Sequence, residues 1–363
     1  MSLIPVSVLT GFLGAGKTTL LNRLMQRPEM ANTAVIINEF GEIGIDHLLV
    51  ARSDENVIEM ASGCLCCTIR GDLIETFDDL LAKRDAGTIK PFDRVVIETT
   101  GLADPAPILH TLMSDPKLFR RIALDGVVTL VDAMTGKATL DRHPEAVKQA
   151  AVADRIVLTK ADMAGATSPG DIATLTARLK ALNPAAPVIP VVRGEIDPAR
   201  LFDAGVYDPT TKHPDVLGWL QAEAYLAPHQ HDHAHGHDHG HDHHGHDHGR
   251  SGQDAHDVNR HDARIRAYCV VRDQPISAQA FNLFVEILTA NAGENLLRVK
   301  GILNLTEAPD TPVIVHGVQH LFHPVEFLQA WPSEDHRSRL VFITRDIPQD
   351  HIERLLDGLN TAG

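Results

Sequence analysis

The sequence predicts an α/β fold, with a parallel sheet flanked by helices, followed by a smaller C-terminal α+β domain. Up to about residue 205, short apolar runs alternate with longer amphipathic segments, which is typical of parallel strands joined by crossover helices. The apolar runs are rich in Val and Ile without lasting alternation, so we expect strands buried on both faces. The length of 363 residues corresponds to roughly two domains of about 150 residues with connecting material.

The expected elements of the first domain alternate between strand and helix along the chain. We predict strands at residues 5–9, 34–38, 94–98, 126–132, 155–159 and 188–192. We predict helices at residues 17–26, 69–84, 144–151 and 171–182. Each helical stretch begins near a Gly, Pro, Thr or Asp, and these residues commonly mark helix starts.

A break in composition follows the first domain. Residues 229–248 contain 11 His, four Asp and three Gly, with no large apolar side chain to anchor them to a core, so we expect a disordered linker or loop. After this break the sequence returns to strand and amphipathic helix patterns. We predict strands at 264–272, 296–305, 312–315, 318–322 and 339–344, a helix at 278–290 with Phe281, Phe284, Val285 and Leu288 on one face, and a final helix with Ile352, Leu355, Leu356 and Leu359 on one stripe. The predicted domain boundaries are 1–212, 213–262 for the linker, and 263–363.

The composition excludes several classes of protein. The 33 Lys and Arg against 48 Asp and Glu give a net charge of −15, which argues against a general affinity for nucleic acids or anionic membranes. No stretch approaches the ~18 consecutive apolar residues of a membrane span. Three of the four cysteines lie within four positions, where disulfides between neighbours are strained, so clustered thiols indicate metal or redox chemistry in a cytoplasmic protein.

Residues 11–18, Gly-Phe-Leu-Gly-Ala-Gly-Lys-Thr, match the phosphate-loop pattern G-x-x-x-x-G-K-[ST] between a predicted strand and a predicted helix. The glycines let the backbone wrap around phosphates, and the helix start adds the positive end of its dipole. We expect Lys17 to reach the β and γ phosphates and Thr18 to ligate Mg²⁺. An ordinary glycine turn is the alternative. We assign the nucleotide site of this P-loop NTPase sheet to Gly11, Gly14, Ala15, Gly16, Lys17, Thr18 and Thr19.

Two later segments suit a nucleotide hydrolase. Glu98 ends an apolar strand, where its carboxylate is expected to face the Mg²⁺ or its water shell, and Gly101 lets a backbone N–H approach the γ phosphate. A strand-end carboxylate without a metal is the alternative. At residues 159–162, Thr-Lys-Ala-Asp, a guanine base is expected to lie over the Lys160 stem and donate two hydrogen bonds to Asp162, although a capped turn would explain these residues equally well.

The cysteine triplet predicts a metal site. Cys64, Cys66 and Cys67 precede a predicted helix whose N-terminus favours thiolates, and thiolates bind ions such as Zn²⁺. In the loop after the second strand, Glu42 is the candidate fourth ligand and Glu39 the candidate that orients the attacking water. The alternatives are buried thiols that pack as small hydrophobes and a redox switch. Cys269 stands alone in a predicted strand and is assigned to the core.

With the segments 11–18, 38–42, 63–67, 98–101 and 159–162 in this order, the chain resembles the CobW-like P-loop GTPases over nearly its whole length. The Cys-x-Cys-Cys triplet between the phosphate loop and the Glu-x-x-Gly segment is that family's own mark. The resemblance implies a GTPase domain, a CobW-type C-terminal α+β domain, and GTP hydrolysis coupled to the handling of zinc or cobalt. Members of the family are regarded as metal chaperones or insertases, and one branch is linked to cobalamin biosynthesis.

The resemblance also implies particular site residues and partners. It places the nucleotide on Gly14, Gly16, Lys17, Thr18, Lys160 and Asp162, and the metal on Cys64, Cys66 and Cys67. The guanine motif usually begins with Asn, whereas Thr159 supplies a hydroxyl but no amide, so weaker base contacts are expected. The implied cofactors are Mg²⁺ and Zn²⁺ or Co²⁺, GTP is the substrate, and the implied partner is a client metalloprotein, with a homo-oligomer as a further option.

The histidine run at residues 229–248 indicates a second place where the chain binds metal ions. A flexible chain can wrap several imidazoles around Zn²⁺, Co²⁺ or Ni²⁺, so the run is interpreted as a metal reservoir or capture arm, and a solvated linker is the alternative. A storage module and a redox-sensing NTPase compete with the chaperone hypothesis, and a nucleic-acid-dependent ATPase is the weakest alternative. The accessory metal ligands are His229, His231, His233, His235, His237, His239, His241, His243, His244, His246 and His248.

Overall fold

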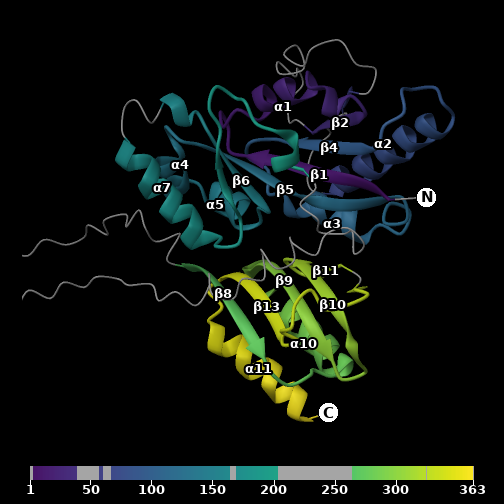
Figure 1. Cartoon of the computed structure of the whole chain (residues 1–363), viewed down its shortest axis with the longest axis vertical. Coiled ribbons are helices and arrows are strands. Elements are labelled where there is room, and N and C mark those ends of the chain that lie inside the picture. Colours follow the sequence, from purple (N-terminus) through teal and green to yellow (C-terminus); the bar gives the residue numbers. More distant parts are fainter. Residues whose placement is uncertain are drawn as a thin grey trace, which may run out of the picture.

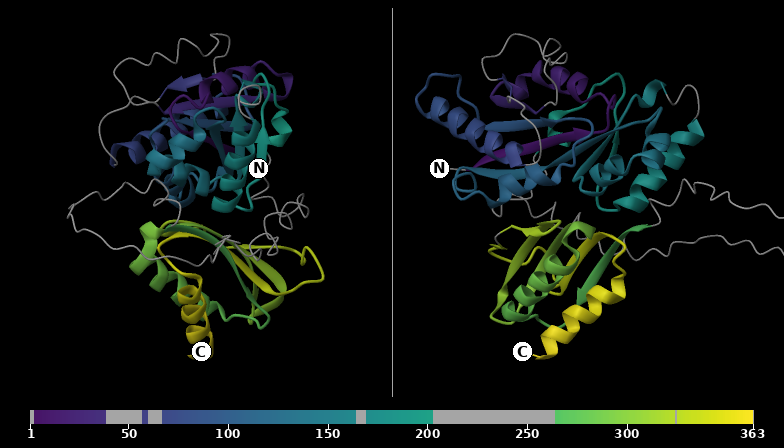
Figure 2. Two further views of the ribbon diagram at one scale, coloured as in Figure 1. Left: turned by 90° about the vertical axis from the view of Figure 1, so that its left-hand side faces the viewer. Right: turned by 180° about the vertical axis from the view of Figure 1, so that it is seen from behind.

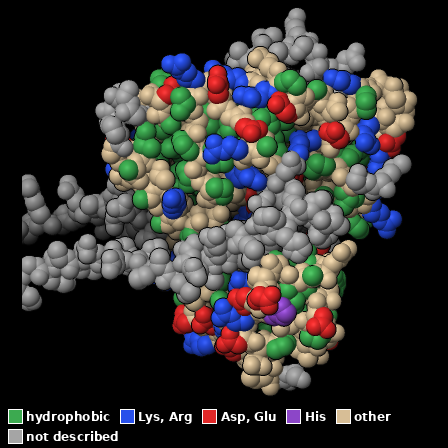
Figure 3. Space-filling view, viewed as in Figure 1, with side chains coloured by type: hydrophobic (Ala, Val, Ile, Leu, Met, Phe, Trp, Pro, Cys, Tyr) green, Lys and Arg blue, Asp and Glu red, His purple; other side chains and the backbone are tan. Residues whose placement is uncertain are grey.

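The computed structural model describes residues 3–38, 57–59, 67–163, 169–202, 264–323 and 325–362. These residues form two domains, each built of a sheet and helices, with the first domain above the second in Figure 1. On the face drawn in Figure 3, acidic and basic side chains are interspersed over both domains. Within the described residues, no helix is long and apolar enough to cross a membrane.

The first domain contains a parallel sheet that, in the described part of the chain, has seven strands in the order β3-β2-β4-β1-β5-β6-β7. Its strands are β1 (Ile4–Gly11), β2 (Thr33–Asn38), β3 (Val57–Glu59), β4 (Arg94–Thr99), β5 (Ile122–Asp132), β6 (Arg155–Thr159) and β7 (Val188–Pro190). All neighbouring strands in this order run parallel. The carboxyl ends of these strands therefore meet at one edge, where ligands of such sheets bind.

Helices cover both faces of this sheet. They are α1 (Lys17–Met25), α2 (Cys67–Asp85), α3 (Ala106–Ser114), α4 (Gly136–Arg142), α5 (Pro144–Ala151) and α7 (Pro169–Leu182). Val8 of β1 belongs to one buried cluster with Phe77 of α2 and Leu109 of α3. The next residue, Leu9, belongs to a second cluster with Leu21 of α1 on the opposite face. The predicted burial of strands on both faces is confirmed.

The second domain is an antiparallel sheet with two helices on one face. Its strands are β8 (Ile265–Arg272), β9 (Leu296–Leu305), β10 (Ala308–Val318), β11 (Leu321–Phe322), β12 (Glu326–Phe327) and β13 (Ser338–Arg345). The strand order is β11-β10-β9-β13-β8, and β12 pairs with β10. The helices are α10 (Ala278–Ala292) and α11 (Gln349–Ala362). Phe281, Phe284 and Leu288 of α10 pack with Phe342 of β13 and Leu356 of α11, as the helical spacing of these apolar residues predicts.

Some predicted elements differ from the structure. Two strands are present where 312–315 and 318–322 were expected, but the predicted break between them is misplaced. The strand β10 continues to Val318, the chain turns at Gln319, which has a left-handed φ of 54°, and β11 begins at Leu321. The strand expected at 188–192 ends at Pro190. The sequence prediction missed the helix α3, because most of its residues are buried, Thr111 included, so it lacks the amphipathic pattern by which a helix is recognised.

Two apolar clusters of the first domain extend into the second domain. Val318 of β10 belongs to the cluster that contains Leu109 and Leu112 of α3, and Leu297 of β9 belongs to the cluster that contains Val147 of α5. Figures 1 and 2 show the second domain lying beneath α3 and α5. These two helices of the first domain therefore pack against the second domain.

A buried charge cluster lies at the same interface. Asp154, which follows α5, accepts hydrogen bonds from the side chains of Arg298 and Lys300 in β9 and from the backbone N–H of Val127. Burial alone would raise the pKa of Asp154, but attraction to the two cations and their hydrogen bonds holds this pKa well below its usual range. Burial lowers the pKa of Lys300 to about 8. Mutual pairing therefore compensates the charges that the interface removes from water.

Candidate functional site

The phosphate loop follows β1 in a shape that requires its glycines. A Cβ at Gly11 would lie 2.4 Å from the carbonyl oxygen of Leu130 in β5, so no other residue fits there. Gly14 and Gly16 have left-handed φ angles of 76° and 89°, which favour glycine. Helix α1 begins at Lys17, so its N-terminal N–H groups lie at the loop.

The structure brings the predicted Mg²⁺ ligands together. The Thr18 hydroxyl donates a hydrogen bond of 2.7 Å to Oε1 of Glu98, although 80 residues separate them. Glu98 is placed there because β4 lies next to β1 in the sheet, where Leu9 pairs with Glu98. A hydroxyl beside a carboxylate is the hard oxygen donor set that Mg²⁺ takes. Lys17 is buried and donates to the Gly11 carbonyl oxygen at 2.9 Å, which holds it within the loop.

Gly101, the predicted contact to the γ phosphate, packs directly on the phosphate loop. A Cβ at Gly101 would lie 2.6 Å from the backbone nitrogen of Leu13 and 2.7 Å from its Cα. Only a glycine lets the two backbone segments approach so closely. The structure therefore places the segment after β4 against the phosphate loop.

The predicted guanine segment follows β6 and is tied to the same loop. The Lys160 Nζ donates to the Gly14 carbonyl oxygen at 3.0 Å and to the Asp132 carboxylate at 2.7 Å. The Thr159 hydroxyl donates to the Ala15 carbonyl oxygen at 2.8 Å. Asp162 is exposed, so its carboxylate is accessible at the edge of the site.

The metal-site predictions fall mostly outside the described residues. Cys64, Cys66, Glu39, Glu42 and the eleven histidines of residues 229–248 lie there. Cys67 is the first residue of α2. Among the residues that the structure describes, no three His, Cys, Asp or Glu side chains are grouped to hold a metal ion. Cys269 is buried in β8, and burial raises the pKa of its thiol to about 11, as suits a core residue.

Two residues near the phosphate loop escaped the sequence prediction. Asp132 ends β5 at the same sheet edge, and that position was a usable signal. Gln149 is fully buried in α5, and its amide donates to the carbonyl oxygens of Gly101 and Ala103 at 3.3 and 3.0 Å. A glutamine within a short helix carries no sequence signal for such a role.

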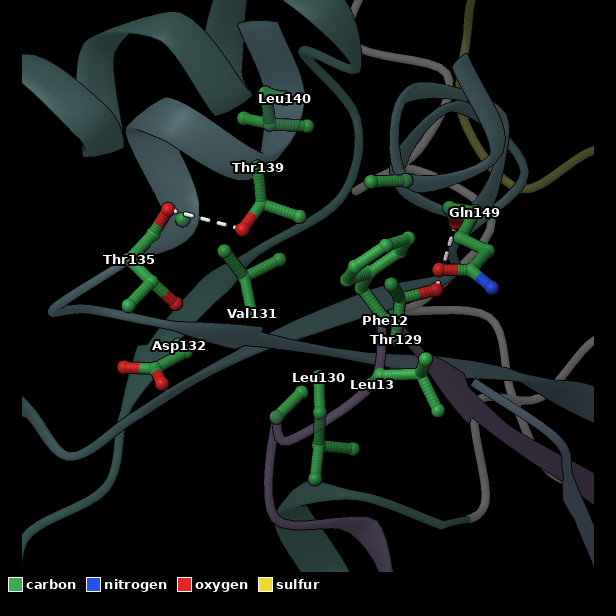
Figure 4. Close-up of a pocket in the computed structure, with 13 residues that line it drawn as sticks. Phe12, Leu13, Thr129, Leu130, Val131, Asp132, Thr135, Thr139, Leu140 and Gln149 are labelled. Carbon is green, nitrogen blue, oxygen red and sulfur yellow. Dashed lines mark hydrogen bonds between the residues drawn. The ribbon is translucent and has the colours of Figure 1, made fainter. Parts of the chain in front are cut away.

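A small pocket lies between the phosphate loop, β5 and α4 (Figure 4). Its lining includes Phe12, Val131 and Leu140, and Phe12 is stacked on His143 with ring centroids 4.3 Å apart. The cavity volume of about 20 Å³ is room for roughly one water molecule. The pocket is too small for a nucleotide and belongs to the packing behind the loop.

Comparison with known proteins identifies the family. Residues 5–190 match the model of the CobW/HypB/UreG nucleotide-binding domain, and residues 265–360 match that of the cobalamin synthesis protein cobW C-terminal domain. The zinc chaperone YjiA of Escherichia coli is 33% identical over 99% of both chains. The zinc-regulated GTPase metalloprotein activator 1 of Saccharomyces cerevisiae is 30% identical over 59% of this chain and 54% of its own.

A solved structure agrees with these sequence matches. The crystal structure of Zn(II)-bound YjiA GTPase from E. coli superimposes with a TM-score of 0.68 at 30% identity and covers 99% of both chains. The likeness therefore includes the phosphate loop, the parallel sheet and the second domain together. The chain belongs to the CobW/HypB/UreG family of nucleotide-binding proteins and is a GTPase of its CobW branch.

Proposed function

We propose that this GTPase couples the hydrolysis of GTP to GDP and phosphate to the binding of zinc and its transfer to a client metalloprotein in the cytoplasm. The observation that carries the proposal is the 33% identity with a zinc chaperone over 99% of both chains. Because this likeness runs through both domains, it supports a shared activity of the whole chain. The assembled phosphate loop supplies the nucleotide half of that activity.

The geometry of the described residues supports the roles that we propose for Lys17, Thr18 and Glu98 at the nucleotide site. Lys17, at the start of α1, is the cation for the β and γ phosphates. Thr18 and Glu98 would hold Mg²⁺, which neutralises phosphate charge when bound. Asp162 would accept hydrogen bonds from the guanine base beside the Lys160 stem. Glu39, outside the described residues, is proposed to orient the attacking water.

The roles at the zinc site rest on the donor chemistry of the sequence. We assign zinc to the thiolates of Cys64, Cys66 and Cys67, with Glu42 as fourth ligand. Cys67 opens α2, and a helix N-terminus favours the thiolate form. The histidines of residues 229–248 serve as a capture arm that delivers zinc to the thiolates. Cobalt is a competing cargo for the same donor set.

The deciding experiment measures whether nucleotide and zinc affinities are coupled. A variant lacking residues 229–248 removes the histidines, which would otherwise mask the thiolate site. Its zinc and cobalt affinities are measured by chelator competition with GDP and with a non-hydrolysable GTP analogue. We expect a difference of at least about tenfold between the two nucleotides, which is about 1.4 kcal/mol of coupling. A matched variant that also carries Cys66→Ala should lose the nucleotide-dependent component.

The other outcomes point to other functions. Equal zinc affinities in both nucleotides would mean that hydrolysis does not gate the site, which is the behaviour of a storage module. Hydrolysis that responds to oxidation of the thiols, and not to zinc, would indicate a redox sensor. Zinc binding that survives Cys66→Ala in the deletion variant would move the metal site away from the triplet.

A further inference from the structure

The segment between Gly101 and Asp104, which follows β4, is hydrogen-bonded by the buried side-chain amide of Gln149. Gln149 of α5 is 0% exposed, and its Nε2 donates to the carbonyl oxygens of Gly101 and Ala103. The position of Gln149 is itself fixed, because the Thr129 hydroxyl donates to its backbone carbonyl at 2.7 Å (Figure 4). Hydrogen bonds within the first domain therefore hold the backbone of this segment at Gly101 and Ala103.

The other side of the segment is held through Asp104. Its Oδ1 accepts a hydrogen bond from the Ala106 backbone N–H at the start of α3 at 3.0 Å. Its Oδ2 accepts hydrogen bonds from Lys148 Nζ at 3.0 Å and from the amide of Gln319 at 3.3 Å. Gln319 belongs to the second domain, so this carboxylate links the segment to a different part of the chain.

The turn that carries Gln319 is firmly seated on the first domain. Val318, the residue before it, is 6% exposed and packs in the cluster that contains Leu109 of α3. The Val318 carbonyl oxygen accepts a hydrogen bond of 2.8 Å from Nε2 of His110. The ring of His320, the residue after it, meets the His110 ring edge-on with centroids 4.4 Å apart. Gln319 is thus presented to Asp104 by a turn that is anchored on both sides.

The far end of the held segment is the phosphate loop. Gly101 approaches Leu13 so closely that a Cβ would lie 2.6 Å from the Leu13 nitrogen. A continuous set of contacts therefore runs from Leu13 through Gly101 and Asp104 to Gln319. In such a network a shift at one end is felt at the other, because packed backbone segments do not deform freely.

We infer that Gln149 and Gln319 are positioning residues for GTP hydrolysis, and that the second domain tunes the nucleotide site through Gln319. They hold the segment from Gly101 to Asp104 so that the Gly101 backbone N–H faces the terminal phosphate. A donor that is already in place needs no reorganisation during the reaction, which is how such groups accelerate it. GDP lacks the γ phosphate that Gly101 would face, so binding of GDP is expected to be independent of this support. The inference concerns the GTPase cycle alone and does not require zinc transfer.

The test replaces Gln319 by Met in the full chain, because Met has a similar length and packs well but cannot donate to Asp104. We measure single-turnover hydrolysis of GTP and the dissociation constants of GDP and of a non-hydrolysable GTP analogue. We expect hydrolysis to slow about five- to tenfold and binding of the analogue to weaken about threefold or more. Binding of GDP should stay unchanged.

Asn360→Ala is the matched control. The Asn360 amide nitrogen donates to the Pro275 carbonyl oxygen at 3.3 Å, the same length as the bond from Gln319 to Asp104, and its Oδ1 accepts from the Ser277 backbone N–H at 3.1 Å. Both bonds lie inside the second domain. Their loss should leave hydrolysis and the ratio of GTP-analogue to GDP affinity unchanged. An equal slowing in this control would show a general loss of stability and would overturn the positioning role.

A charge variant tests the same contact in the opposite sense. Gln319→Glu brings a second carboxylate to Asp104, so hydrolysis should slow more than in Gln319→Met, and adding Asp104→Asn should restore part of it. Melting temperatures show which variants are folded. If Gln319→Met proves unstable, the comparison of Gln319→Glu with the double variant Gln319→Glu and Asp104→Asn serves as the test. Wild-type hydrolysis and an unchanged affinity ratio in folded Gln319 variants would overturn the inference. The GTPase assignment would stand in that case, because it is judged on the unaltered chain.

Discussion

The hydroxyl of Thr159 donates a hydrogen bond to the backbone carbonyl oxygen of Ala15, which ties the end of β6 to the phosphate loop at 2.8 Å. The following residue, Lys160, adds a second bond to the Gly14 carbonyl oxygen. The position that usually carries Asn in the guanine motif therefore braces the loop in this chain. The departure from the family pattern is compatible with a well-formed nucleotide site.

Removing this brace should weaken both nucleotides. Thr159→Val keeps the shape of the side chain but leaves the buried Ala15 carbonyl oxygen without its hydroxyl partner, which costs about 1–3 kcal/mol. We expect GTP and GDP to lose affinity by similar factors, because both bind the same loop. Fluorescent-nucleotide titration measures the two constants. Thr159→Ser, which keeps the hydroxyl, should behave like the wild type, and a loss confined to GTP would contradict this role.

Glu98→Gln should change the Mg²⁺ requirement. The amide can still accept the hydrogen bond from Thr18 but lacks the negative charge that draws a divalent cation. We expect the Mg²⁺ concentration for half-maximal hydrolysis to rise about 10–100-fold. The measurement is a Mg²⁺ titration of the hydrolysis rate at fixed GTP. Asp79→Asn, at an exposed carboxylate paired with Lys83, is the control; an unchanged midpoint for Glu98→Gln would remove Glu98 from the Mg²⁺ site.

Asp162→Asn should reduce discrimination for guanine. A carboxylate accepts two hydrogen bonds from guanine, whereas the asparagine amide accepts one and opposes the other donor. A hydrogen bond to a charged group contributes about 1.5–3 kcal/mol, so GTP affinity should fall at least about tenfold. Xanthosine triphosphate, with a carbonyl where guanine has an amine, should bind the variant better than the wild type. Competition against a fluorescent GDP measures both, and equal GTP affinity would place the base elsewhere.

Gly101→Ala should disable the nucleotide site. The new methyl group would lie 2.6 Å from the Leu13 nitrogen, so the phosphate loop or the segment after β4 must move. We expect hydrolysis to fall by about a hundredfold or more, since misplacement of about 1 Å has this effect. Gly71→Ala in α2 is the control, because a Cβ there would meet no atom within 4 Å beyond its chain neighbours and the backbone of its own helix. It should raise stability by up to about 1 kcal/mol. Normal hydrolysis in Gly101→Ala would mean that the segment moves away from the loop during turnover.

Asp154→Asn should destabilise the chain in a pH-dependent way. The pKa of Asp154 is depressed in the folded state, so its contribution to stability is present above the unfolded pKa of about 3.8 and is lost as pH falls below it. At pH 7 the variant leaves Arg298 and Lys300 without their carboxylate, which costs about 3–5 kcal/mol for a buried pair. Calorimetry should find that the difference in the free energy of unfolding between the variant and the wild type becomes smaller as the pH is lowered below 4. Asp346→Asn, which breaks an exposed pair with Arg264, should have little effect.

Periodicity and motif context were sufficient for much of the fold. Strand β6 and helix α5 match their predicted bounds, because each is a short run with clear flanking signals. The contact between Thr18 and Glu98 was also foreseeable, since Thr18 lies after β1 and Glu98 lies near the carboxyl end of the neighbouring parallel strand β4. These relations are local or follow directly from strand order.

The features that sequence reasoning missed depend on contacts between distant segments. Gln149 is identified only by the two carbonyl groups that it meets, 46 and 48 residues away. Likewise, the turn at Gln319 could not be recognised as an interface, because its neighbours Val318 and Leu321 look like ordinary strand residues. The apolar surface that receives them lies on α3, a helix whose residues are mostly buried. A surface that is buried against another domain need not show a periodic spacing of apolar residues in the sequence.

The shared apolar clusters bear on how this chain folds and evolves. Val318 and Leu297 complete cores that begin in the first sheet, so cutting the chain between residues 202 and 264 would expose apolar surface on both pieces. Neither piece is then expected to be a free module, and the two should melt in one cooperative transition. Exchanging the C-terminal domain between relatives would need compensating changes along α3 and α5. The residues on the two sides of this interface are therefore expected to have evolved together.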